Sequence, residues 1–357
     1  MKSSNHRLLD RLGIAMPIIQ APMAGVSTPA MAAAVCEAGA LGSIGVGAVD
    51  PSAARAMIDE IRRRTAAPFN VNLFCHRPAR ANMEVEQAWI SRMRPAFEAF
   101  GAEPPETLSE IYRSFIDDEA MLAMLVEARP AVVSFHFGLP SRAAIRALGE
   151  AGIVLLATAT NLAEARLIEA ANIDAIVAQG WEAGGHRGTF DPDLPDDQLG
   201  VMALTRLLVR ETGLPVIAAG GIMDGAGIAA VCESGAAAAQ LGTAFVGCDE
   251  SQADDGYREA LADVAAHHTV MTRVISGRPA RCLANRFTAI GSTVPAEAVP
   301  DYPIAYDLGK SLHAAGKARG EYGYGAQWAG EGAPLSRSMS AAALIATLAV
   351  EYERAMQ

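Results

Sequence analysis

Charged residues are scarce in this chain of 357 residues and make up 19% of it, where about 25% is usual. Basic residues are the rarer kind, with 29 lysines and arginines against 40 aspartates and glutamates and a formal net charge of −11. This balance argues against nucleic acid or an anionic membrane surface as the main partner, because both attract basic proteins. It leaves room for a local cationic pocket that binds a small anion.

Cysteine is also sparse, and its spacing carries no metal or disulfide pattern. The five cysteines are widely spread, and no Cys-x-x-Cys occurs, so reduced thiols in a cytoplasmic enzyme are favoured over a disulfide framework or a zinc site. The apolar stretches 38–49 and 213–223 are broken by glycine and are too short to span a bilayer. The first ten residues contain no apolar core, so no secretory signal is expected.

Short apolar runs recur along the chain and alternate with alanine-rich segments of helical periodicity. Eight such runs lie at 16–20, 41–45, 69–73, 131–135, 153–158, 175–179, 215–220 and 237–242. They are nearly continuous rather than alternating, as in parallel strands that are buried on both faces. Helices are expected between them, at 28–38, 51–65, 141–152, 161–171 and 224–234. Eight β-α units predict a TIM (β/α)8 barrel, with an open doubly wound sheet as the alternative.

Two long stretches interrupt this rhythm and divide the chain. The barrel is expected over residues 1–245, with inserted helices at about 78–129, where one connection is too long for a single β-α unit. Residues 246–337 begin with a helical pattern and then become rich in tyrosine, proline and glycine, which predicts a smaller helical lid domain. The last segment, 338–357, predicts a helix that returns to the barrel.

Active sites of such barrels lie at the carboxyl ends of the strands, so the residues that end each strand are the first candidates. Strand one leads into Gln20-Ala21-Pro22-Met23-Ala24-Gly25, an extended segment of little bulk that suits a flat ring, although a plain turn explains it equally well. Asn72 ends the third strand and needs polar partners when buried, which a ligand or the backbone could supply. His136 ends the fourth strand, where a lone histidine is more often a core residue than a catalyst.

The densest cluster of candidates follows the sixth strand, between Gln179 and Gly188. Its four glycines offer backbone N–H groups and allow close approach of a ligand. His186, within this loop, could act as an acid, a base or a hydrogen-bond donor. A mobile glycine linker is the alternative, but the loop falls where barrel chemistry occurs.

The seventh and eighth strands lead into a second pair of glycine segments, Ala219-Gly220-Gly221-Ile222 and Gln240-Leu241-Gly242-Thr243. The loops after these two strands are the usual phosphate site of a barrel. Backbone N–H groups and the Thr243 hydroxyl can hold a dianion without a lysine. One such glycine segment could simply end a strand, but two of them after neighbouring strands are harder to explain in that way. We therefore expect a phosphate-bearing ligand.

The lid segment contains a run of phenols and an ammonium group. Pro303 suits the first position of a helix, which places Tyr306 and Lys310 one turn apart, with Tyr302 at the entry to the same face. These groups could receive a small anion, although a solvated helix face is the more ordinary explanation.

Together and in this order, these segments resemble the nitronate monooxygenases, formerly called 2-nitropropane dioxygenases, and most of all the bacterial class I group. The resemblance rests on residues 20–25, the glycine loop with His186, 219–222 and 240–243, and it extends to 302–310 and 324–330. It implies a TIM barrel that binds FMN without a covalent bond.

The resemblance also implies roles for individual residues. Pro22, Met23 and Ala24 would line the flavin ring. The other residues that would hold FMN are Asn72, Gln179, Gly184, Gly185, Gly220, Gly221, Gln240, Leu241, Gly242 and Thr243. His186 matches the catalytic histidine and His136 a second histidine of the substrate site. The rest of the implied substrate site consists of Tyr112, Tyr257, Tyr302, Tyr306 and Lys310.

The implied reaction is the oxidative denitrification of an alkyl nitronate, plausibly propionate 3-nitronate, with O2 to a carbonyl product and nitrite. FMN-dependent NADH:quinone reductases and enoyl-acyl-carrier-protein reductases have similar glycine loops and stay as alternatives, as does a non-catalytic barrel that binds a phosphorylated ligand. The phenols and lysine of the lid favour the monooxygenase, because a long acyl chain or a quinone would need a more apolar lid. The sequence leaves open whether the protein forms a homodimer.

Overall fold

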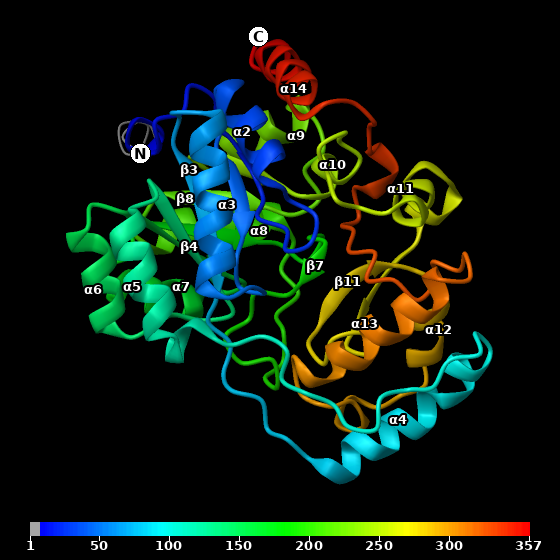
Figure 1. The fold of residues 1–357 in the computed structure, drawn as a ribbon. Coiled ribbons are helices and arrows are strands. Elements are labelled where there is room, and N and C mark those ends of the chain that lie inside the picture. Colours follow the sequence, from blue (N-terminus) through cyan, green and yellow to red (C-terminus); the bar gives the residue numbers. More distant parts are fainter. Residues whose placement is uncertain (1–7) are drawn as a thin grey trace.

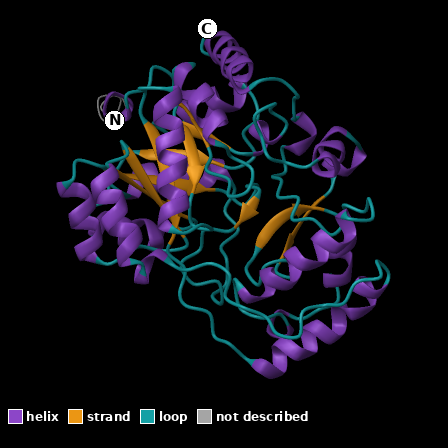
Figure 2. Ribbon diagram, viewed as in Figure 1, coloured by secondary structure: helices purple, strands orange, loops and turns teal. Residues whose placement is uncertain are grey.

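The structure, a computed structural model, describes residues 8–357. Residues 1–7, which belong to the segment in which no secretory signal is expected, lie outside the described residues. Eight parallel strands form one sheet in the order β1-β9-β8-β6-β5-β4-β3-β2 (Figures 1 and 2). They are β1 (Ile18–Gln20), β2 (Gly42–Gly45), β3 (Phe69–Phe74), β4 (Val132–His136), β5 (Val154–Ala159), β6 (Ala175–Gln179), β8 (Val216–Ala219) and β9 (Ala238–Leu241). Each lies within or overlaps one of the predicted apolar runs.

The two ends of this sheet meet, so the sheet is a closed barrel. The Gln20 N–H donates to the Leu41 carbonyl at 2.9 Å, and the Leu41 N–H donates to the Ile18 carbonyl at 3.0 Å. These bonds join β1 to the segment that opens β2. The prediction of a TIM (β/α)8 barrel is confirmed, and the open doubly wound sheet is wrong.

A ring of helices surrounds the barrel (Figure 1). It consists of α2 (Pro29–Glu37), α3 (Pro51–Arg64), α5 (Glu119–Ala128), α6 (Arg142–Glu150), α7 (Leu162–Ala170), α8 (Val201–Glu211), α9 (Gly225–Glu233) and α14 (Ala341–Ala355). Side chains that accept from backbone N–H groups start many of them, as with Thr28 before α2 and Asp50 before α3. The C-terminal helix α14 packs against α9 and α2 and so completes the ring.

Alternation along the strands separates two layers of core. In β5 and β6, Val154, Leu156 and Val177 point into the barrel, whereas Leu155 and Ile176 face the helices. Leu8 and Leu12 belong to the inner cluster and help to fill the barrel at the end where the strands begin. The same alternation turns the last inward residues of several strands toward the other, open end, where the candidate site lies.

The long connection between β3 and β4 contains both a barrel helix and an excursion. Helix α4 (Met83–Glu98) leaves the barrel and packs on α13 (Ile304–Lys317), while α5 packs against α3 and α6. A short turn of 3-10 helix at Phe115–Asp117 precedes α5. The stretch expected as an insertion at about 78–129 therefore ends with one of the helices of the barrel itself.

The lid contains a small sheet that the sequence did not predict. Strands β10 (Thr269–Thr272) and β11 (Ala280–Leu283) pair antiparallel, and β11 also pairs with β7 (Gly185–His186), which lies in the glycine loop after β6. Around this sheet lie helices α10 (Thr243–Val246), α11 (Asp255–Ala262), α12 (Arg286–Gly291) and α13, with 3-10 turns at Val264–His267, Ala296–Ala298 and Ala333–Leu335. Residues 246–337 are mainly helical outside this sheet, and the strand β7 that joins them comes from a loop almost a hundred residues earlier in the chain.

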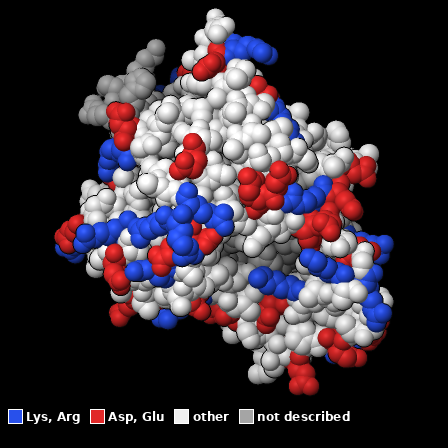
Figure 3. Space-filling model, turned by 45° about the horizontal axis from the view of Figure 1, so that its top comes forward, with Lys and Arg blue, Asp and Glu red and all other residues white. Residues whose placement is uncertain are grey.

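The surface and the helices fit the composition. No helix among residues 8–357 is long and apolar enough to cross a membrane. On the face shown in Figure 3, acidic and basic side chains lie close to one another, and a hollow lies between the barrel and the lid. All five cysteines are free thiols.

Candidate active site

A cavity of about 610 Å³ lies where the barrel strands end and the lid begins. Its barrel side is formed by the carboxyl ends of the strands and its other side by residues of the lid. All but one of the residues to which the resemblance assigns a role in binding or catalysis line it. The exception is Leu241, whose side chain packs in the core and whose carbonyl accepts from the Ala21 N–H at 2.8 Å.

The segment after β1 is held extended by a buried glutamine. Gln20 accepts from the Ser43 N–H at 2.8 Å and donates to the Ser27 hydroxyl at 2.9 Å, and that hydroxyl accepts from the Met23 N–H at 2.9 Å. These bonds satisfy the buried amide within the protein. The backbone of Pro22, Met23 and Ala24 therefore forms a fixed wall of the cavity.

Asn72, at the end of β3, offers a carbonyl oxygen to the cavity. Its Nδ2 donates to the Ser134 hydroxyl at 2.9 Å and to the Ser134 carbonyl at 3.2 Å. Both hydrogens of the amide are used in this way, so Oδ1 is the atom that is left for a ligand.

His136, at the end of β4, is a neutral imidazole with both nitrogens engaged. Its Nε2 donates to the His186 carbonyl at 3.3 Å, and its Nδ1 lies 3.0 Å from the Thr158 hydroxyl, which therefore donates. Burial, and then the positive charge of Arg278, lowers the pKa of His136 to about 4. Gly188 covers this pair so closely that a Cβ there would lie 2.6 Å from a Thr158 methyl carbon.

His186 points into the cavity from β7, the strand that joins the glycine loop to the lid. Its Nε2 lies 2.8 Å from the Ser276 hydroxyl, which leaves Nδ1 for a ligand. The ring is packed among aromatic side chains, with Trp328 at 5.0 Å and Tyr302 at 5.3 Å between ring centroids. Burial, together with the charge of Arg278, lowers the pKa of His186 well below its ordinary value, so the imidazole is neutral.

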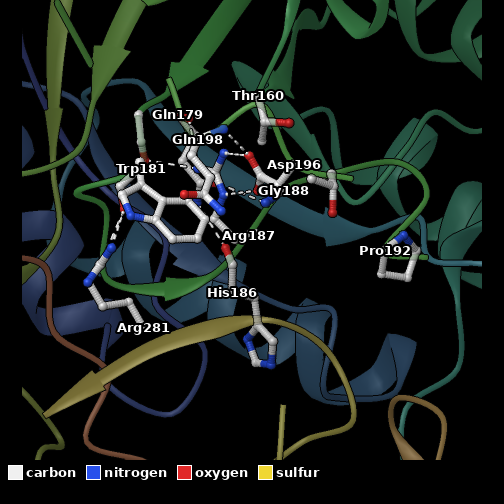
Figure 4. Close-up of polar contacts among 12 residues, drawn as sticks. Thr160, Gln179, Trp181, His186, Arg187, Gly188, Pro192, Asp196, Gln198 and Arg281 are labelled. Carbon is white, nitrogen blue, oxygen red and sulfur yellow. Dashed lines mark hydrogen bonds and ion pairs between the residues drawn. The ribbon is translucent and has the colours of Figure 1, made fainter. Parts of the chain in front are cut away.

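An arginine closes the loop that carries His186 (Figure 4). The fully buried guanidinium of Arg187 pairs with Asp196, with Nε–Oδ2 at 2.8 Å and Nη2–Oδ1 at 3.1 Å. Its Nη1 donates to the carbonyls of Gln179 and Gly180 at 3.0 and 2.9 Å and to Oε1 of Gln179 at 3.3 Å. These hydrogen bonds and the ion pair hold the glycine loop in one conformation, so it is not a mobile linker.

The glycines of the cavity wall allow the barrel and the lid to meet. A Cβ on Gly184 would lie 2.5 Å from the Gly330 nitrogen, and one on Gly330 would lie 2.6 Å from the Glu182 carbonyl. The Thr243 hydroxyl accepts from the Gly330 N–H at 3.0 Å, so its own hydrogen is free to donate. At Gly242 a Cβ would meet only ordinary contacts at 3.5 Å or more, and the space beyond it belongs to the cavity.

Phe137 and Arg278 are central to the site, and the sequence did not single them out. Phe137 packs against the rings of His136 and His186 at 4.4 and 5.7 Å, and it adopts a φ of 73°, which is unusual for a bulky residue. The buried Arg278 guanidinium stacks 4.2 Å from the Phe137 centroid and donates to the Thr189 carbonyl. Burial lowers its pKa to about 10, so it stays charged at neutral pH. Arg278 is distant in sequence from the strands of the barrel, so no barrel strand end marks it.

The lid brings three phenols and Lys310 to the cavity. The ammonium of Lys310 lies 5.1 Å from the ring centroid of Tyr112 and 5.5 Å from that of Tyr306. Burial raises the pKa of Tyr306 to about 12 and that of Tyr302 well above its ordinary value, so both are neutral donors. Tyr257 also lines the cavity, but its hydroxyl donates to the Trp328 carbonyl and so supports that residue.

Ion pairs tie the lid to the loops of the barrel beside the site. Arg77, which follows β3, pairs with Asp193 at 2.9 Å, and Arg80 pairs with Asp193 and, at 3.4 Å, with Asp301. Asp301 directly precedes Tyr302, so this network fixes one side of the phenol cluster. Among the described residues no group of three or more His, Cys, Asp or Glu side chains is arranged to hold a metal ion.

Comparison with known proteins places the chain in a family. The family model described as nitronate monooxygenase matches residues 5–351. The chain belongs to the nitronate monooxygenase family. A nitronate monooxygenase of Paraburkholderia phytofirmans is 60% identical over 356 residues, which is 100% of this chain and 97% of that protein. A nitronate monooxygenase of Pseudomonas aeruginosa is 55% identical over 347 residues, which covers 97% of this chain and 98% of the relative.

Solved structures share the barrel and the lid of this nitronate monooxygenase family member. A nitroalkane oxidase from Streptomyces ansochromogenes matches with a TM-score of 0.89 at 39% identity and covers 98% of this chain and 99% of its own. FabK from Thermotoga maritima matches with a TM-score of 0.73 at 29% identity and covers 98% and 96%. Both chains are matched over almost their full lengths, so the lid belongs to the shared architecture.

Proposed function

We propose that this protein is an FMN-dependent nitronate monooxygenase that converts alkyl nitronates and O2 into a carbonyl compound and nitrite. The observation that carries the proposal is the two-sided cavity. On the barrel side, amide groups and glycines suit a flat phosphorylated cofactor. On the lid side, neutral phenols, a histidine and Lys310 suit a small anion. The family of the chain supports the same activity.

The barrel side fits a flavin in its hydrogen-bonding pattern. The pyrimidine edge of a flavin carries carbonyl acceptors beside one N–H donor, and Asn72 offers an acceptor while Gln179 has an amide N–H to give. The extended backbone at 21–25 offers a flat wall. Gly221, Gly242 and Thr243, at the ends of β8 and β9, would hold the phosphate, at the usual position for a barrel.

The lid side fits an anionic substrate that is only partly removed from water. Lys310 is exposed enough to meet a ligand from solvent, and its contacts with Tyr112 and Tyr306 keep it at the cavity. The phenols are neutral and can donate to nitro oxygens. A carboxylate on the substrate, as in propionate 3-nitronate, would have Lys310 as its partner.

His186 orients the substrate in this proposal. A bound FMN supplies the electron transfer between the nitronate and O2. The lowered pKa of His186 makes it a weak base, so it is poorly suited to remove a carbon-bound proton from a neutral nitroalkane. Nε2 of His186 is hydrogen-bonded to the Ser276 hydroxyl. Nδ1 of His186 can therefore bind the nitro group of a nitronate that has already lost its proton.

The test is a direct comparison of substrates with the purified protein. We expect a yellow protein with about one FMN per chain that releases nitrite from propionate 3-nitronate without NADH. Rapid NADH oxidation with no nitrite release would instead place the protein among the flavin reductases. A protein that binds no flavin would refute the proposal and favour a phosphate-binding barrel.

A further inference from the structure

We propose that Arg187 is a positioning residue of this site, which orients the side-chain amide of Gln179 so that an N–H group faces the cofactor. The inference rests on the proposed flavin function and adds to it a residue that does not itself line the cavity.

The amide of Gln179 has one allowed orientation. Its Oε1 accepts from the Gly188 N–H at 2.7 Å and from Arg187 Nη1 at 3.3 Å, and its Nε2 donates to the His186 carbonyl at 2.9 Å. Rotating the amide by 180° would place its NH2 against two donors and its oxygen against a carbonyl. Such a buried mismatch costs more than an ordinary hydrogen bond is worth, so the rotated form is excluded.

Arg187 donates to the Gln179 amide and also holds the backbone that surrounds this amide. The guanidinium is fully buried and binds Asp196 with two nitrogens, while Nη1 binds the main-chain oxygens of Gln179 and Gly180. The backbone N–H of Arg187 donates to the Pro279 carbonyl at 2.8 Å, next to β11. Arg187 directly follows β7, and its side chain joins this position to the end of β6 and to the loop at Asp196 (Figure 4). A lysine could not reproduce these contacts, because they use the planar fork of donors.

The consequence concerns the hydrogen of Nε2 that His186 does not use. Gln179 is the last residue of β6, points inward and lines the cavity. The amide therefore presents a donor to the ligand and not an acceptor. A flavin bound here would be held through one of its acceptor atoms, and a donor at that position would bind the reduced flavin more strongly than the oxidised one. Arg187 thereby acts through Gln179 on both the affinity and the reduction potential of the cofactor.

Arg281, in the strand β11 that pairs with β7, provides a matched control. Like Arg187, it is buried and lies with its guanidinium carbon 5.4 Å from the Trp181 ring centroid. It binds the Trp181 carbonyl at 2.9 Å and Glu331 at 3.0 Å, and no contact joins it to Gln179. Its removal should weaken the protein locally to a similar degree and leave the amide of Gln179 in place.

The experiment compares Arg187→Met, Gln179→Glu and Arg281→Met in the full-length protein. FMN affinity is measured by fluorescence titration of the apoprotein, the midpoint potential by equilibration with a redox dye, and stability by thermal unfolding. We expect Arg187→Met to weaken FMN binding by about 10-fold or more and to lower the potential. Gln179→Glu keeps an acceptor for Arg187 and Gly188 but loses the donor to the His186 carbonyl, so thermal unfolding is compared first; it should weaken binding and lower the potential at least as much. Arg281→Met should lose stability alone.

Two results would overturn the proposal. The first is an Arg187→Met protein with wild-type FMN affinity and potential. The second is an equal loss of affinity in Arg187→Met and Arg281→Met, which would make Arg187 a merely structural residue. If Arg187→Met does not fold, Asp196→Asn weakens the ion pair that holds the Arg187 guanidinium, and it must change FMN affinity and potential in the same direction. If the variants show these effects but the wild type releases no nitrite, the proposed reaction is refuted and the role of Arg187 is retained.

Discussion

Replacing His76 with phenylalanine should remove one proton-linked step from the acid unfolding of this protein. His76 follows β3, is 1% exposed, and stands edge-on to the Tyr302 ring with 5.0 Å between centroids. Neither of its ring nitrogens has a hydrogen-bond partner among the described residues. Burial, and then the positive charge of Arg278, lowers the pKa of this imidazole to about 4.

The sign and size of the effect follow from the difference between folded and unfolded states. An unfolded histidine has a pKa near ~6.5, so between that pH and about 4 the unfolded chain binds a proton that the native state does not. Stability due to the neutral imidazole is complete above this window and is lost as the pH falls through it. The slope is ~1.4 kcal/mol per pH unit for one histidine, and roughly 3 kcal/mol over the whole window.

Urea unfolding followed by tryptophan fluorescence between about pH 4.5 and 7.5 measures this slope. His76→Phe should lie within about 1 kcal/mol of the wild type at pH 7, because two unpartnered polar atoms are removed from an aromatic cluster. Its stability should then fall less steeply toward acid by about one proton. His267→Phe, at an exposed position, is the control for replacing a histidine with phenylalanine outside the aromatic cluster. Identical slopes for His76→Phe and the wild type would refute the reasoning.

Three further predictions concern the cavity. Lys310→Met should raise KM for an anionic nitronate about 10-fold with little change in kcat or in the flavin spectrum, because it removes a charge that meets the substrate at binding; unchanged kinetics would return Lys310 to a solvated helix face. His186→Asn should abolish any activity on neutral nitroalkanes and spare a measurable part of nitronate turnover with FMN still bound, and wild-type rates for both substrates would remove His186 from catalysis. Gly242→Leu should fold but bind FMN much more weakly in a fluorescence titration, whereas Gly242→Ala should bind FMN nearly as well, since a Cβ there meets atoms no closer than 3.5 Å; full flavin affinity in the leucine variant would exclude the phosphate site.

The barrel and the outline of its site were readable from the sequence because both depend on local patterns. A parallel strand buried on both faces is a short apolar run, and the run itself states where its carboxyl end lies. Barrel topology brings all such ends to one rim, so Asn72, His136, Gln179 and Gly242 could be assigned to one site without knowledge of any contact. Helix starts were equally local, since residues such as Thr28 and Asp50 cap the helices that they precede.

Tertiary structure alone decided which atoms of these residues are free to act. Strand β7 exists only because it pairs with β11 almost a hundred residues later in the chain, and this pairing turns a glycine loop into the fixed support of His186. Burial, and then the charge of Arg278, lowers the pKa of His136 and His186, and Arg278 does so from a position that no barrel strand end marks. The orientation of the Gln179 amide depends on Arg187, Gly188 and the His186 carbonyl together. The sequence shows which chemical groups a site contains. The direction in which each group donates a hydrogen bond, and its charge state, depend on neighbours that only the folded chain brings into contact.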